Sequence, residues 1–236
     1  MILYILACLI SYIPLIALFL WLRSYVKKDE GFQKICNSFL LRGVLSMFPV
    51  ILISAMCNIL LRLTRMQDSN PLLYKAVYNF VVLALSEEIA KYVITFRKEL
   101  KKHEYPYSWL DVTALMTIVG IGFALFESIV YSLGETIPVV LIRGICLPHA
   151  GYGFITGYFH GKGEKSGQPA YRWIGFALAW FIHGLYDFSL SEELVAINDN
   201  LVIIPLLLAV MDIVLVIIQI VFTVKARRQK VYTEPL

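Results

Sequence analysis

The sequence predicts an all-α integral membrane protein, a bundle of about seven transmembrane helices. Of the 236 residues, 59% are hydrophobic and only 16% are charged, and the mean hydropathy is +0.72. A soluble domain of this length would carry more charge on its surface. The basic residues also gather in short segments between long apolar runs, which is the pattern that orients membrane proteins. We therefore expect the chain to lie in the lipid bilayer, and we expect no nucleic acid among its partners.

The first half of the chain predicts three spans. Met1–Leu22 is apolar, has no basic residue before it and has no small-residue cleavage site, so we expect an uncleaved span. The basic segment Arg23–Arg42 is expected to be a cytoplasmic loop, which places the N-terminus outside. A second span is expected over Val44–Leu61. After the polar turn Arg62–Pro71, a third span is expected from about Tyr74 to Ile94, and a strongly basic stretch follows it.

The second half predicts four more spans, over Trp109–Leu133, Pro138–Tyr158, Arg172–Leu190 and Leu201–Val224. Gly120 and Gly122 stand where a close helix approach would need small residues. The segments expected inside hold 16 Lys and Arg and those expected outside hold 3, which predicts an N-out, C-in topology. We expect a single integral membrane domain over residues 1–236, with a motif-bearing core at about 74–190.

The third expected span holds Glu87, Glu88 and Lys91 within an otherwise apolar run. Each charge costs roughly 2.5 to 3.5 kcal/mol at the bilayer centre, so three together indicate a site. On a helix Lys91 lies one turn from both carboxylates, so all three can share one face. We expect that face to look into the bundle.

Further polar residues interrupt the next three spans: Glu127, Arg143, His149, His183 and Asp187. His183 and Asp187 are spaced i, i+4, so the carboxylate can hydrogen-bond one ring nitrogen and orient the other. Phe123 has the same spacing to the acid that follows it. His149 comes directly after Pro148, which is expected to loosen the helix there and free carbonyls for a polar pocket.

Three interpretations of these residues stay open at this point. They can be structural hydrogen-bond partners between helices, which is the ordinary role of one such residue taken alone. They can relay protons or bind a cation in a small transporter. They can also activate a water for peptide hydrolysis, with a carboxylate as base and His or Lys at the oxyanion. The sequence has no internal repeat, which counts against a transporter.

Four motifs follow one another in successive expected helices: Glu87-Glu88-x-x-Lys91, Phe123-x-x-x-Glu127, His149, and His183-x-x-x-Asp187. Together they resemble the motif set of the PrsW family of intramembrane proteases, which is related to the CAAX-processing and bacteriocin-processing enzymes. The resemblance covers about residues 80 to 190. The CAAX enzymes have a His where Glu127 stands and an Arg one position later than Lys91, so the PrsW branch is the closer match.

This resemblance implies a multi-pass protease of the bacterial cell membrane. It implies the site-1 cut, on the extracytoplasmic side, of a membrane-bound anti-sigma factor, which activates a stress-response sigma factor. The implied partner is a single-pass membrane protein. The implied catalytic residues are Glu87, Glu88, Glu127, His149, His183 and Asp187, and the implied supporting residues are Lys91, Phe123 and Arg143. Of the whole set, Arg143 best fits the alternative role of an anchor, because it stands near the outer end of its span.

Two mechanisms remain open, one glutamic-type and one metal-dependent. In the first, Glu87 or Glu88 acts with Glu127 to deprotonate a water, and a histidine donates to the oxyanion. In the second, a zinc ion lowers the pKa of its bound water, and its ligands are drawn from Glu88, Glu127, His149 and His183. The sequence has no His-Glu-x-x-His motif. We therefore favour the mechanism without a cofactor over the zinc-dependent one.

Overall fold

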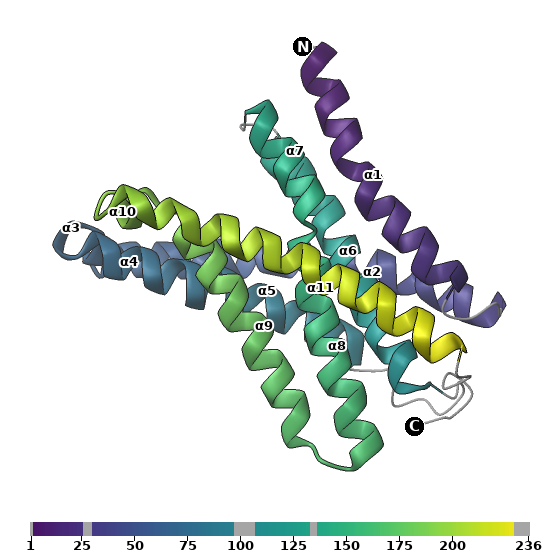
Figure 1. Cartoon of the computed structure of the whole chain (residues 1–236). Coiled ribbons are helices and arrows are strands. Elements are labelled where there is room, and N and C mark those ends of the chain that lie inside the picture. Colours follow the sequence, from purple (N-terminus) through teal and green to yellow (C-terminus); the bar gives the residue numbers. More distant parts are fainter. Residues whose placement is uncertain (1, 26–29, 97–106, 133–135, 229–236) are drawn as a thin grey trace.

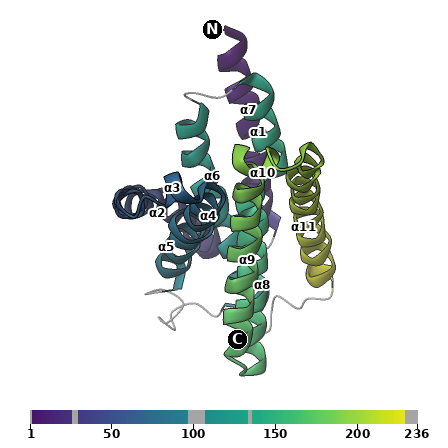
Figure 2. The same cartoon turned by 90° about the vertical axis from the view of Figure 1, so that its left-hand side faces the viewer.

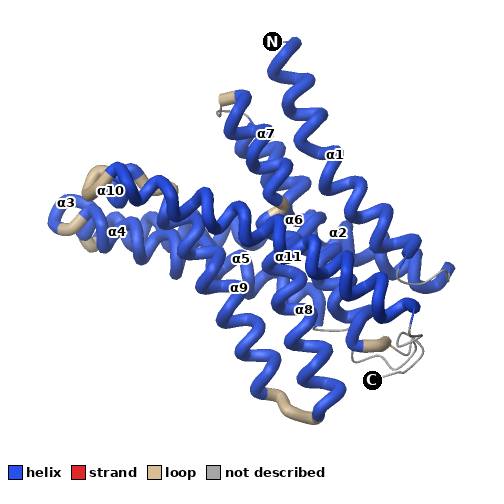
Figure 3. Tube along the Cα trace, in the orientation of Figure 1, coloured by secondary structure: helices blue, strands red, loops and turns tan. Residues whose placement is uncertain are grey.

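The computed structural model describes residues 2–25, 30–96, 107–132 and 136–228. Every regular element in these ranges is a helix, which confirms the all-α prediction (Figures 1 and 3). The long helices are α1 (Ile2–Tyr25), α2 (Glu30–Leu63), α6 (Trp109–Ser132), α8 (Pro148–Ser166), α9 (Ala170–Ser189) and α11 (Ile203–Arg228). The shorter elements are α3 (Met66–Ser69), α4 (Pro71–Val77), the π-helical η1 (Tyr78–Ala84), α5 (Leu85–Phe96), α7 (Ile137–Cys146), α10 (Glu192–Val195) and the 3-10 turn η2 (Asp199–Val202).

Helix α6 forms the centre of the bundle. In the most apolar 18-residue stretch of α6, 78% of the residues are buried inside the protein. The corresponding share is 22–28% in α1, α2 and α11. Gly43 of α2 and Gly122 of α6 meet at a crossing so close that a side chain at either position would overlap the facing backbone. Gly120 lies equally close to the carbonyl of His149 on α8. The prediction that Gly120 and Gly122 allow close helix approach is confirmed, and these contacts place α8 against α6.

Helix α2 begins much earlier than the sequence suggested. The prediction of a loop over Arg23–Arg42 is wrong for residues 30–42, which form the first turns of this helix. The physical reason is a buried face at helical spacing, made by Phe32, Cys36, Phe39 and Gly43. Basic residues on the other faces mask this periodicity in the sequence.

The third expected span is a nearly continuous helix made of α4, η1 and α5. Pro71 starts it, and the side chain of Asn70 caps it by accepting a hydrogen bond from the Leu73 amide at 3.1 Å. The π-helical turns of η1 end just before the glutamate pair. Here Trp180 of α9 donates from its indole nitrogen to the Phe80 carbonyl at 2.7 Å. Such π-helical insertions are frequent at functional sites, and this one sets how the following glutamates are turned.

The fifth expected span, Pro138–Tyr158, is not one helix. The chain breaks between α7 and α8 at Leu147, whose φ of 53° lies in the left-handed region. Pro148 is the first residue of α8, where its missing N–H costs no helical hydrogen bond. The prediction of a merely loosened helix is therefore wrong, and His149 stands in the first turn of a new helix.

In the described part of the chain, four helices are long and apolar enough to cross a membrane: α1, α2, α6 and α11. Each of the other expected spans overlaps helical segments, while the number seven and the orientation remain predictions. Helix α10 packs beside α4 at one end of the bundle, where Lys75 and Glu193 form an ion pair of 3.5 Å (Figures 1 and 2).

Candidate functional site

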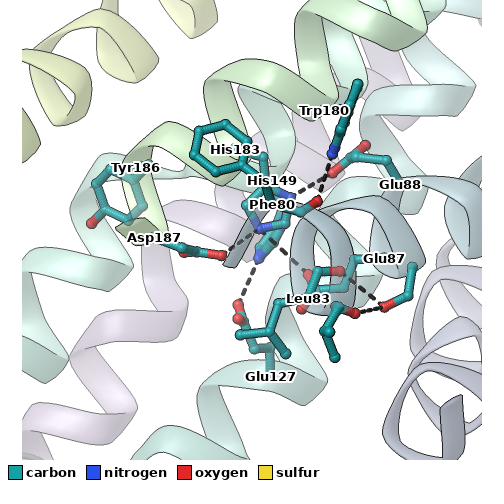
Figure 4. Close-up of polar contacts among 12 residues, drawn as sticks. Phe80, Leu83, Glu87, Glu88, Glu127, His149, Trp180, His183, Tyr186 and Asp187 are labelled. Atoms are coloured by element: carbon teal, nitrogen blue, oxygen red, sulfur yellow. Dashed lines mark hydrogen bonds and ion pairs between the residues drawn. The ribbon is translucent and has the colours of Figure 1, made fainter. Parts of the chain in front are cut away.

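Four helices bring the polar residues of the motifs into one cluster inside the bundle (Figure 4). Helix α5 contributes Glu87, Glu88 and Lys91, α6 contributes Phe123 and Glu127, α8 contributes His149, and α9 contributes His183 and Asp187. All of these side chains are nearly withdrawn from the surface except Asp187, whose side chain is 23% exposed. Among these described residues, Asp187 is therefore the most exposed member of the cluster.

Glu88 links two helices through one carboxylate oxygen. Its Oε1 accepts from Lys91 Nζ at 2.5 Å and lies 2.9 Å from His183 Nδ1. These three side chains are 2% exposed or less, so the contacts form away from water. The Lys91 ammonium and the His183 ring both contact the buried carboxylate, and a buried ion needs such partners. Glu88 is thus placed to hold Lys91 and the His183 ring.

His183 faces carboxylates on both sides of its ring. Its Nε2 lies 3.2 Å from Asp187 Oδ2, as the i, i+4 spacing predicted, and 3.6 Å from Glu87 Oε2. That oxygen of Glu87 is buried and has no hydrogen-bond partner among the described residues. Glu87 therefore has an oxygen available inside the cluster, in contrast to Glu88.

His149 carries the second half of the cluster. Its Nε2 lies 2.7 Å from Glu127 Oε2, and its Nδ1 lies 3.1 Å from Lys91 Nζ. Phe123 closes this side, with its ring 4.8 Å from the His149 ring and 4.6 Å below the Lys91 ammonium. Such a cation–π contact stabilises a desolvated ammonium. Lys91 thereby joins the Glu88–His183 pair to the Glu127–His149 pair.

The donor set of the cluster fits a divalent metal ion. Glu87, His149 and His183 each offer one ligand atom, and these atoms lie within 4.8 Å of one another. Two ligands of one zinc ion lie at most about 4 Å apart, so small side-chain rotations would bring the three onto one ion. The unpartnered Glu87 oxygen supports the fit. The sequence-based ligand set was Glu88, Glu127, His149 and His183, and the structure brings two of these, His149 and His183, together with Glu87 within that distance of 4.8 Å.

A small cavity of about 10 Å³ adjoins the cluster beside Glu127 and His149. Leu147 and Pro148, at the break between α7 and α8, line it together with Leu15 of α1. About one water occupies this much space when polar partners face it. The cavity therefore provides a place for a single water next to a carboxylate and an imidazole.

Two residues that the motifs did not single out belong to the surroundings of the cluster. The Tyr152 ring stacks on the His183 ring with centroids 4.9 Å apart. Asp212 of α11 is fully buried. An acid inside the last apolar run was a signal in the sequence that could have found Asp212, whereas nothing local distinguishes Tyr152. The side chain of Arg143, predicted to support the site, lies outside the described part of the structure.

Comparison with known proteins agrees with the geometry. The family model for PrsW family intramembrane metalloproteases matches residues 31–219. The chain is 28% identical to Protease PrsW of Geobacillus kaustophilus, over 73% of this chain and 76% of that protein. It is 27% identical to Protease PrsW of Clostridioides difficile, over 78% and 79%. With Protease PrsW of Bacillus subtilis it shares 35% identity over 31% of this chain and 36% of that protein. No solved structure matches the chain.

Proposed function

This chain belongs to the PrsW family of intramembrane metalloproteases and is a protease embedded in a bacterial membrane, and we propose that its substrate is a single-pass anti-sigma factor. In this proposal the enzyme makes the site-1 cut, on the extracytoplasmic side, and thereby activates a stress-response sigma factor. The motif resemblance supports this substrate. The family match favours hydrolysis over the transporter interpretation, because the matched relatives are named as proteases.

The position of the cluster along its helices supports a cut near the outer surface. Asp187 stands two residues before the end of α9, and Glu127 five residues before the end of α6. His149 is the second residue of α8. In the predicted topology the ends of α6 and α9 face the outside, whereas the start of α8 lies about midway along the expected span Pro138–Tyr158. A substrate that enters from that side would meet the cluster without crossing the whole bilayer.

The convergence of Glu87, His149 and His183 beside a one-water cavity is the observation that carries the proposed chemistry. These three residues would hold a divalent metal, which when bound lowers the pKa of a water and polarises the scissile carbonyl. Glu127 lines the cavity and is the group we assign to accept the proton of the attacking water. His149 fixes the orientation of the Glu127 carboxylate.

The metal-free version uses the same residues in other roles. Glu87 then acts with Glu127 as the base, and His183 donates to the oxyanion. The family description and the converging donors support the metal version. We therefore propose a metal ion at this site, and the experiment below separates the two versions.

Purified enzyme is incubated in detergent, with no membrane gradient, with a single-pass anti-sigma factor. We expect one cut on the extracytoplasmic side of the substrate span. After treatment with a strong chelator and verified metal removal, cleavage should stop, and it should return on addition of zinc. Metal analysis of Glu87→Gln should show less bound metal than the wild type. Full cleavage by enzyme that is verified to be free of metal would contradict the metal version. An enzyme that cuts control substrates but leaves the anti-sigma factor intact would contradict the substrate proposal.

A further inference from the structure

Helix α11 carries a buried acid on a helix that otherwise faces lipid. Between Ile203 and Phe222 its exposed residues, where described, are all apolar and include Leu206, Val210, Val214, Ile217 and Val221. Asp212 lies on the opposite side and is 0% exposed, and neither carboxylate oxygen has a hydrogen-bond partner among the described residues. An unpaired acid inside a membrane-spanning helix is costly, so Asp212 requires a ligand or a donor.

Asp212 lies directly against the start of α8. A methyl group added to Gly151 would be 3.3 Å from Asp212 Oδ1. The carboxylate can therefore lie next to the backbone of α8 because Gly151 has no side chain. Leu215, about one turn after Asp212, packs against the apolar cluster that contains Tyr152. Asp212 therefore faces the turn of α8 that carries both Tyr152 and His149. In Figure 1, α11 crosses α8 in this part of the bundle.

Tyr152 is the residue through which α11 can act on the candidate site. Its ring stacks on the His183 ring at 4.9 Å and stands edge-on to the His149 ring at 5.7 Å. The side chain is 1% exposed, and its hydroxyl has no hydrogen-bond partner among the described residues. Asp212 lies against Gly151, the residue directly before Tyr152 on α8. A hydroxyl donor and a carboxylate acceptor thus belong to the same contact between α8 and α11, and both are buried and without a hydrogen-bond partner among the described residues.

We propose that Asp212 and Tyr152 bind one ordered water behind His183 and that Asp212 is a positioning residue of the protease site. The two carboxylate oxygens and the phenolic oxygen supply three partners, within the two to four that a buried water makes. The bridge satisfies polar groups that are otherwise buried without a hydrogen bond, which is unfavourable. It anchors the free end of Tyr152, whose ring then restricts how the rings of His183 and His149 can turn.

This inference rests on the proposed role of His183 in hydrolysis, but its test does not need a substrate. The rings of the histidines are labelled with ¹⁵N, and the His183 signal is recorded in detergent. Tyr152→Phe keeps the stacked ring and removes only the hydroxyl, and Asp212→Leu removes the acceptor. Both should move the His183 ring signal. The matched control is Gln219→Leu, which changes another buried polar residue of α11. It should leave the His183 ring signal unchanged, because Gln219 donates a hydrogen bond to Thr117 on α6 at 2.7 Å.

Rescue separates hydrogen bonding from charge and from packing. Asp212→Asn keeps an oxygen that can bind the water, so it should preserve the His183 signal, whereas Asp212→Leu should not. In cleavage assays Tyr152→Phe and Asp212→Leu should each lower kcat about tenfold with KM nearly unchanged, and the double variant should lose little more. The proposal is overturned if Asn is as damaging as Leu, if the two effects multiply, or if neither variant moves the ring signal.

Failure of this inference and failure of the proposed function look different. If the variants behave as expected in the ring signals but no anti-sigma factor is cut, the substrate proposal is wrong and the water site stands. If the wild type cuts its substrate and the His183 ring signal is the same in both variants as in the wild type, the water site is wrong and the proposed protease function stands.

Discussion

Glu87 and Glu88 are adjacent in the sequence, but their surroundings give them different tasks. Glu88 shares one oxygen between Lys91 and His183, whereas Glu87 keeps an oxygen with no hydrogen bond in the described structure. The first carboxylate holds the buried Lys91 ammonium and contacts the His183 ring on a second helix. The second is free to bind a metal or a water.

Glu88→Gln and Glu87→Gln should therefore differ in stability more than in activity. Glu88→Gln leaves the buried Lys91 without its anion, so we expect a loss of about 3–5 kcal/mol in unfolding free energy together with lost cleavage. Glu87→Gln should lower cleavage about 10²- to 10⁴-fold and leave stability near the wild type. Melting temperature in detergent and cleavage rate measure the two effects. Equal destabilisation by both variants would refute this division of roles.

His183 and Asp187 allow a second test at this scale. His183→Ala should lower the cleavage rate by at least about 10²- to 10³-fold, because it removes a ligand or an oxyanion donor. Asp187→Asn should cost only about 10- to 100-fold, since Glu88 still holds the other ring nitrogen. His160→Ala, at a buried histidine outside the cluster, serves as the control for loss of an imidazole. Near-normal turnover in His183→Ala would remove this histidine from the site.

At the scale of elements, close crossings on α6 decide where the histidine of α8 stands. The backbone of Gly120 touches the carbonyl of His149, and Gly122 meets α2 in the same helix. Together with the break at Leu147, this contact holds the first turn of α8 at the level of Glu127. Small residues here are therefore part of the site geometry, not only of the packing.

Gly120→Ala should disturb the site from a distance. The added methyl overlaps the His149 carbonyl, so α8 must shift, and we expect a loss of about 1–3 kcal/mol in stability with a disproportionate loss of cleavage. Gly163→Ala in the same protein provides the control, because its nearest atom would be 3.1 Å away. Thermal melting and cleavage are measured on both. A Gly120→Ala enzyme with unchanged turnover would show that the contact does not position His149.

At the scale of the whole molecule, the orientation in the membrane decides which side of a substrate reaches the site. The acidic turn at residues 191–200, with no Lys or Arg, is predicted to face outside, and the basic α8–α9 turn to face the cytoplasm. Both turns contain exposed residues that can be labelled.

Cysteine labelling in intact cells tests this topology. In a variant without its four natural cysteines, Ala196→Cys should react with an impermeant thiol reagent added outside. Ser166→Cys should react only after the cytoplasmic face is opened. The reverse pattern would overturn both the N-out, C-in topology and the proposed side of the cut.

The sequence by itself determined that this is an all-helical membrane protein with a polar site in its interior. Apolar length and the cost of buried charge are properties of short stretches, so they can be read without knowing what packs against them. The same holds for the spacing of His183 and Asp187 and for the small residues of α6. The motifs therefore indicated nearly the whole candidate site.

Only the tertiary structure decided how these residues share their tasks. The break at Leu147, the π-helical turns before Glu87 and the depth at which Glu127 meets His149 result from contacts between distant segments. Glu88 is engaged by Lys91 and His183, whereas Glu87 keeps an oxygen without a hydrogen bond among the described residues, although the two residues are of the same type. Tyr152 enters the surroundings of the site because its ring packs on His183, and a ring contact between two helices leaves no trace in the spacing of either one.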